Sequence, residues 1–83
     1  MLIADGLDDA ILGVGSRCGQ PDLVVYDESR IINILMERDG MSYSEALEFY
    51  EFNIKGSWVG DDTPIWLKGM DRDELAHYVE ENG

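Results

Sequence analysis

Residues 41–56, MSYSEALEFYEFNIKG, carry the signals of a complete helix, and the rest of the chain can be placed around it. Ser42 followed by Glu45 is the pattern of a capping box, in which two side chains satisfy two backbone N–H groups at the start of a helix. Gly56 is expected to adopt the left-handed conformation that closes the far end. The stretch therefore predicts a helix over residues 43–55.

Winding this helix at 3.6 residues per turn divides its side chains between two sides. The apolar side, expected to face the core, consists of Tyr43, Ala46, Leu47, Tyr50 and Ile54. The other side is acidic and carries Glu45, Glu48 and Glu51. Phe52 falls between Glu45 and Glu48, with Phe49 at the edge of the same side. A large ring there either packs under another element or binds a partner, so this side is a candidate binding surface.

Composition indicates one small, strongly acidic domain over residues 1–83. Eighteen acidic and six basic residues give a net charge of −12. A chain of this size buries only about 60–65% of its unfolded surface, so we expect marginal stability. Self-repulsion lowers that stability further, and salt is expected to relieve it.

The charge argues against direct binding to nucleic acid or to an anionic membrane, because both require clustered Lys and Arg. The basic residues are scattered along the chain: Arg17, Arg30, Arg38, Lys55, Lys68 and Arg72. The natural partner is a basic protein surface.

A cytoplasmic protein is expected. Cys18 is the only cysteine, so no internal disulfide forms and nothing indicates an oxidising compartment. The first basic residue is Arg17, which leaves no positively charged start of a signal peptide. The longest nearly apolar run, residues 31–36, is too short to span a bilayer.

The first 22 residues predict an edge strand, a helix and a loop. Residues 1–4 are apolar and suit the strand, and Asp5 is the N-cap of a helix over residues 6–12. A metal site at these aspartates lacks the EF-hand spacing. The glycines of residues 13–22 are spaced G-x-G-x-x-x-G, one residue too long for a dinucleotide fingerprint, so a tight loop is expected. Cys18 within it is expected to be small, buried and inert.

Residues 23–42 predict a strand followed by the first helix of a hairpin. Residues 23–26, LVVY, are apolar on both faces and suit a central strand. Asp27 caps a helix over residues 28–38 that Gly40 ends. Only residues 39–42 precede the next helix, the spacing of a helical hairpin and equally of a DNA-binding helix-turn-helix. The acidic second helix would repel DNA, so the hairpin is interpreted as structural.

The remaining residues predict a β-hairpin and a last helix. Residues 57–59 and 65–67 flank a turn that contains Asp61 and Asp62, so Trp58 and Trp66 are expected to face each other, unless one of them anchors a partner. Asp71 with Glu74 forms a second capping pattern, which opens a helix ending at about residue 80. The residues expected to point inward from it are Leu75, Tyr78 and Val79.

Together these elements predict an α+β fold: a small three- to four-stranded sheet packed by a helical hairpin and short terminal helices. Catalysis is disfavoured, because the single His and the single Cys are far apart in the chain and the carboxylates lack a ligand spacing. No cofactor and no metal ion are expected.

Five motifs, taken in order, resemble one family of short acidic proteins encoded by phages, prophages and other mobile elements. They are DGLDDAILGVG from Asp5, RCGQPD from Arg17, VVYD from Val24, DGMSYSEALEFYEFN from Asp39 and GSWVGDDTPIW from Gly56. The resemblance covers residues 1–67, and residues 68–83 add a C-terminal helix outside it. It implies a mobile-element setting in a bacterial host, not an activity.

The charge and this setting favour an inhibitor that mimics nucleic acid and blocks host defence machinery of the anti-CRISPR or anti-restriction type. Glutamates three apart on a helix rise about 4.5 Å, and one DNA strand presents a charge about every 3.4 Å. The expected contact residues are Glu45, Glu48, Glu51, Phe49, Phe52, Asp61 and Asp62. The hypothesis requires a concentrated negative surface.

The alternative is a small phage structural or adaptor protein that forms a homo-oligomer, such as a homodimer. Its contacts would be a patch of Phe49, Phe52 and Trp58, and its acidity would serve solubility alone.

Overall fold

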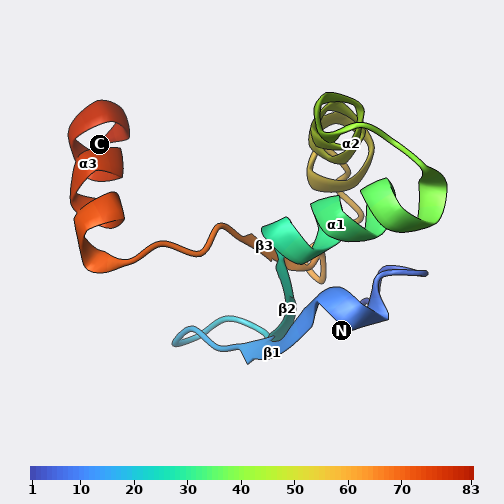
Figure 1. The fold of residues 1–83 in the computed structure, drawn as a ribbon. Helices are drawn as coiled ribbons and strands as arrows, with labels where there is room; N and C mark the ends of the chain where they lie inside the picture. The colour runs from blue at the N-terminus through green and yellow to red at the C-terminus, as the bar shows by residue number, and fades with distance from the viewer.

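A three-stranded sheet with helices on one face forms the body of the protein in the computed structural model, which describes residues 1–83 (Figure 1). The strands are β1 (Ile11–Gly15), β2 (Leu23–Asp27) and β3 (Ile65–Leu67). The helices are the 3-10 helix η1 (Asp8–Ala10), α1 (Glu28–Asp39), α2 (Tyr43–Phe49), the π-helix η2 (Tyr50–Lys55) and α3 (Arg72–Asn82). The predicted α+β class is confirmed.

Strand β2 is central, as predicted, because it pairs with a strand on each edge, and its alternate residues Val24 and Tyr26 are buried. On one edge it pairs antiparallel with β1, so that Ile11 lies opposite Tyr26. On the other edge it pairs parallel with β3, so that Val25 lies opposite Ile65. The parallel connection runs through α1, α2 and η2, which therefore pack together over the sheet.

The predicted N-terminal elements are wrong. Residues 1–4 form no strand, although the N–H of Ala4 donates a 2.7 Å hydrogen bond to the Tyr26 hydroxyl. The predicted helix over residues 6–12 is reduced to the single turn η1, because Ile11 and the residues after it pair with β2 instead. The expected loop is correspondingly short, and Cys18 in it is exposed rather than buried.

The helical hairpin is confirmed. α1 ends at Asp39, followed by Gly40 in the left-handed conformation with φ of 69°. The capping box of α2 is present, since Glu45 N–H donates to Ser42 Oγ at 3.2 Å and Ser42 N–H donates to Glu45 Oε1 at 3.0 Å. α1 and α2 contact each other.

The helix predicted over residues 43–55 changes character at Tyr50, where the wider turns of the π-helix begin. Ala46 and Tyr50 of the expected inner side are fully buried, but Tyr43 is exposed. Gly56 is not left-handed as predicted, because its φ is −74°. Glycine is needed for a different reason: an added Cβ would lie 2.9 Å from the carbonyl oxygen of Glu51.

The predicted β-hairpin of residues 57–67 is also wrong. Residues 57–59 form no strand, and β3 takes β2 as its partner. Trp58 is 72% exposed, so it does not face Trp66. Trp66 packs instead on Tyr26 and Tyr50, with ring centroids 5.3 Å and 6.4 Å away.

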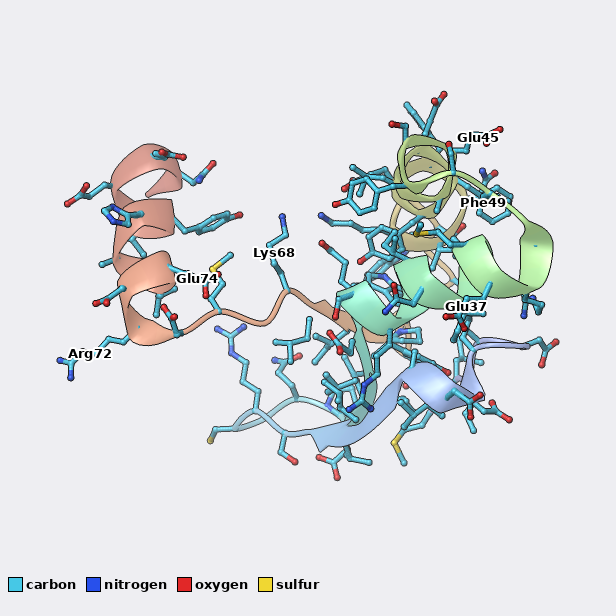
Figure 2. The ribbon with its side chains drawn as sticks, viewed as in Figure 1. Glu37, Glu45, Phe49, Lys68, Arg72 and Glu74 are labelled. Carbon is cyan, nitrogen blue, oxygen red and sulfur yellow. The ribbon has the colours of Figure 1, made fainter.

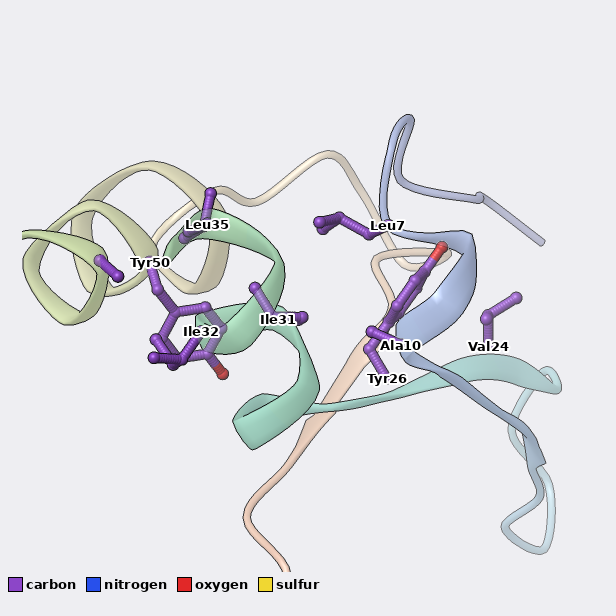
Figure 3. Close-up of a cluster of buried hydrophobic side chains, with 9 residues drawn as sticks. Leu7, Ala10, Val24, Tyr26, Ile31, Ile32, Leu35 and Tyr50 are labelled. Carbon is purple, nitrogen blue, oxygen red and sulfur yellow. The ribbon is translucent and has the colours of Figure 1, made fainter. Parts of the chain in front are cut away.

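The core lies between the sheet and α1 (Figure 3). Its nine buried residues are Leu7, Ala10, Val24, Tyr26, Ile31, Ile32, Leu35, Ala46 and Tyr50. Leu7 precedes η1, and the others come from η1, β2, α1, α2 and η2, so the N-terminal turn and the hairpin share one cluster. No helix is both long and apolar enough to cross a bilayer.

The C-terminal helix α3 stands apart from this body (Figure 1). Its capping box is confirmed, because Glu74 N–H donates to Asp71 Oδ1 at 2.8 Å. The inward orientation expected for its apolar residues is wrong: no residue of α3 is buried. Lys68, in the segment between β3 and α3, contacts both parts of the molecule. Its Nζ lies 3.9 Å from Glu28 Oε1 and 5.9 Å from the Tyr78 ring centroid.

Candidate protein-interaction surface

A shallow hollow on the outer side of the second helix gathers four of the predicted contact residues, Glu45, Glu48, Phe49 and Phe52. Its volume is about 470 Å³, and Met41 and Asn53 complete the lining. Figure 2 shows Glu45 and Phe49 on the side of α2 that faces away from α3. We call this hollow and its lining the α2 surface.

Helix periodicity explains why these side chains meet. Relative to Glu45, the other three lie at positions i+3, i+4 and i+7, which share one face of a helix. The π-helix begins only at Tyr50, so three of the four are placed by regular α-helix. Phe52 is 76% exposed and forms the most accessible ring of the surface.

The structure does not bring the other three predicted residues to the α2 surface. Glu51 lies in the π-helix and forms an ion pair with Lys55, Nζ to Oε2 3.8 Å. Asp61 and Asp62 lie in the exposed turn that the Thr63 hydroxyl closes through a 2.7 Å hydrogen bond to the Gly60 carbonyl. None of the three lines the hollow.

The two carboxylates of the α2 surface have no basic neighbour in the hollow. The backbone N–H of Ser42, which donates to Glu45, lowers the pKa of that carboxyl below its usual value, so Glu45 stays ionised in more acidic solution. Four of the six basic residues of the chain form ion pairs elsewhere, with Asp27, Asp39, Glu51 and Glu28. The α2 surface thus combines negative charge with exposed aromatic area.

Negative charge is not confined to this surface. Asp8, Asp9 and Glu37 line a second hollow beside Arg38, between the N-terminal turn and the last turns of α1. α3 carries further acidic residues, Asp73, Glu74, Glu80 and Glu81. The concentrated negative face that mimicry requires is therefore divided into several acidic groups, of which the α2 surface alone includes exposed phenylalanines.

A larger hollow, which no sequence pattern predicts, lies beside the α2 surface and shares Phe49 and Asn53 with it. This apolar groove of about 580 Å³ lies between the N-terminal segment, the C-terminal end of α1, η2 and the residues before β3. Its apolar lining includes Ile3, Leu35, Phe49, Ile54, Val59 and Trp66. Four segments distant in sequence form it, so no local pattern indicated it. The only sequence signal for it is the apolar start of the chain, residues 1–4, and that signal predicts a strand.

No group of three or more His, Cys, Asp and Glu side chains is placed to hold a metal ion. Cys18 lies in the turn between β1 and β2, and His77 lies in α3. No family model, no curated protein and no solved structure matches the chain. The chemistry of its surfaces is therefore the basis for a functional proposal.

Proposed function

We propose that this protein acts without catalysis, by binding a basic surface on a nucleic-acid-binding protein through the α2 surface. The observation that carries the proposal is the exposed ring of Phe52 beside two carboxylates, Glu45 and Glu48, with no basic side chain in the hollow. Charge steers two proteins together, and a desolvated aromatic ring supplies affinity that charge alone does not.

The class of partner follows from the same surface. Glu45 and Glu48 rise about 4.5 Å along the α-helix, close to the spacing of about 3.4 Å between the charges of one DNA strand. A groove that accepts phosphates can therefore accept this pair. The resemblance to phage and mobile-element proteins supports inhibition of host defence machinery, such as CRISPR effector complexes or restriction enzymes, in the cytoplasm of a bacterial host.

Competition provides the test. A fluorescent duplex DNA is bound to a purified restriction enzyme or CRISPR effector complex in about 50 mM NaCl, and the acidic protein is titrated in. We expect it to displace the DNA. Phe52→Ala should raise the concentration needed for half-displacement about tenfold, because an interface anchor is lost.

The control compares two variants that remove the same charge in different places. Glu45→Gln/Glu48→Gln changes the α2 surface, and Gln at position 45 still accepts the capping hydrogen bond. Glu80→Gln/Glu81→Gln changes only the exposed C-terminal helix. Equal losses of DNA displacement in the two variants would mean that net charge alone acts. Failure of the wild type to displace DNA from any restriction enzyme or CRISPR effector complex tested would refute the proposal.

The adaptor hypothesis remains the second candidate, because the rings of Phe52 and Trp58 are 76% and 72% exposed. Burial of these rings between copies would form a homo-oligomer without any host partner. Analytical ultracentrifugation distinguishes the two proposals. An oligomer that Phe52→Ala/Trp58→Ala abolishes favours the adaptor, whereas unchanged sedimentation of this variant opposes it.

A further inference from the structure

The protein exposes more surface than a compact chain of its mass. Its accessible area is 6071 Å² at 9.4 kDa, whereas a folded monomer of that mass exposes about 5,000 Å². The radius of gyration is 13.8 Å, against about 12 Å for a compact domain of this length. The excess is about 1,000 Å² per chain, so two chains together have about 2,000 Å² available, the area of a standard stable interface.

Helix α3 accounts for the extended shape. It has 11 residues and buries none of them, and a helix of this length is marginal in water without packing. Leu75, Tyr78 and Val79 are 50%, 44% and 53% exposed. Their i, i+3, i+4 spacing places them on one face, so α3 presents an apolar stripe that its own chain leaves about half exposed, with Lys68 Nζ 5.9 Å from the Tyr78 ring centroid.

The apolar groove is a complementary receptor for such a stripe. Amphipathic helices bind hydrophobic grooves through anchors at this spacing. Ile3 and Val59 on the groove are each 62% exposed, and the half-buried Trp66 also lines it. The molecule thus carries both an uncovered helix and an uncovered groove.

The chain does not fill its own groove in this structure. Lys68 lies beside Glu28, at the start of α1, whereas Leu35 and Arg38 near the end of α1 line the groove. None of the residues that line the groove belongs to α3, and Figure 1 shows α3 away from the helical layer beside which the groove lies.

We infer that two copies of this chain form a symmetric dimer in which each α3 packs its Leu75, Tyr78 and Val79 stripe into the apolar groove of the other copy. Such an exchange of identical elements is isologous and closes with two chains. It does not depend on the proposed host partner, and of the α2 surface only Phe49 and Asn53 also line the groove.

Salt gives this dimer a signature of its own. Each copy carries a charge of −12, and the groove lining includes a single basic residue, Arg38. Repulsion between the copies therefore opposes association, and screening relieves it. The dimer is expected to tighten between 50 and 500 mM NaCl, whereas binding of an acidic surface to a basic partner weakens over that range.

Sedimentation equilibrium at both salt concentrations measures the association. Leu75→Ala/Val79→Ala shortens the stripe and keeps good helix formers, and we expect a dimer dissociation constant at least about 100-fold higher because both arms lose apolar contacts. Ile3→Gln/Val59→Gln, which changes exposed groove residues, should have a similar effect. Phe52→Ala, outside the groove, is the matched control and should associate like the wild type.

Mixing and cross-linking test the exchange itself. The Leu75→Ala/Val79→Ala protein (the arm variant, altered in α3) has an intact groove, and the Ile3→Gln/Val59→Gln protein (the groove variant) has an intact α3. Their mixture should therefore form a heterodimer, although neither variant dimerises alone. In a Cys18→Ser/Val59→Cys/Val79→Cys protein, oxidised glutathione should produce chains joined in pairs. Disulfides within single chains, a wild type that is monomeric at about 100 μM in both salts, or an arm variant that dimerises like the wild type would each overturn the inference.

Discussion

The hydroxyl of Tyr50 donates a 3.0 Å hydrogen bond to Oε2 of Glu28, which joins the first residue of the π-helix to the first turn of α1. Tyr50 is fully buried, and Glu28 is half-buried and also lies 3.9 Å from Lys68 Nζ. Burial, followed by the hydrogen bond and the negative charge of Glu28, raises the pKa of Tyr50 well above its ordinary value of 10.0.

This contact predicts a loss of stability in alkaline solution. The unfolded chain releases the Tyr50 proton above about pH 10, while the folded chain retains it. Rising pH therefore stabilises the unfolded state relative to the folded one and lowers the free energy of unfolding. The contribution is complete below pH 10 and is lost towards the raised folded pKa, at about 1.4 kcal/mol per pH unit. Urea unfolding between pH 9 and 11.5 measures it.

The Tyr50→Phe variant is the control for that series. It should be less stable than the wild type by about 1 kcal/mol at pH 7, because Glu28 loses a hydrogen-bond donor. The other tyrosines and the lysines titrate in both proteins, so the difference between the two curves isolates Tyr50. Parallel curves above pH 10 would contradict the assignment.

The two capping boxes predict opposite results for equivalent substitutions. Ser42→Ala should lower the free energy of global unfolding by about 1 kcal/mol, because α2 contributes Ala46 to the core. Asp71→Ala removes the same kind of cap from α3, which buries nothing, so it should leave global unfolding of a monomer unchanged and only accelerate amide exchange in α3.

Chemical denaturation with hydrogen exchange on the same samples separates these two effects. The proposed dimer adds a further expectation. At concentrations where the dimer forms, Asp71→Ala should also weaken association, since a frayed helix costs more to order on binding. Equal losses of global stability in the two dilute monomers would show that α3 packs on its own body.

The elements predicted correctly from sequence are those specified within a few residues. The capping pairs Ser42–Glu45 and Asp71–Glu74 and the terminator Gly40 each act inside one turn of chain. The elements predicted wrongly depend on partners far away. Ile11 lies in a strand because Tyr26 is its neighbour, and β3 pairs with β2 at a sequence separation of 40, as in Val25 with Ile65, rather than with the segment just before it.

The candidate site follows the same division. Glu45, Glu48 and Phe49 share one face, as the helix periodicity predicts, because they belong to the α-helical part of the stretch, and Phe52 follows within one turn. Glu51 lies in the π-helix, pairs with Lys55 and does not line this hollow. The apolar groove combines four separate segments, so only the folded structure could reveal it.

Gly56 provides a sharp test of the π-helix. A Cβ there would lie 2.9 Å from the Glu51 carbonyl oxygen and 3.0 Å from that of Phe52, and neither backbone atom can move freely. Gly56→Ala should therefore destabilise the protein by about 1–3 kcal/mol. Gly69→Ala is the matched control, because a Cβ at position 69 meets nothing within 4 Å and should change stability by less than about 0.5 kcal/mol.

Thermal unfolding in the Leu75→Ala/Val79→Ala background, where dimerisation is removed, tests the balance of charge within one chain. Raising NaCl from 50 to 500 mM screens the repulsion of a −12 chain and also screens its four ion pairs. Surface ion pairs contribute little, so relief of repulsion should dominate and the melting temperature should rise. A fall would mean that the ion pairs stabilise the fold more than repulsion destabilises it.

The acidic group of Asp8, Asp9 and Glu37 locates part of this repulsion, since the three side chains line one hollow. Asp8→Asn/Asp9→Asn/Glu37→Gln changes the net charge from −12 to −9 without removing an ion pair. We expect this variant to melt at a higher temperature than its parent in 50 mM NaCl and to gain less from added salt. Because Arg38 is held by the Gly6 carbonyl at 2.7 Å and by Asp39, its contacts survive the substitutions, and a lower melting temperature would show that these carboxylates stabilise the N-terminal turn rather than repel one another.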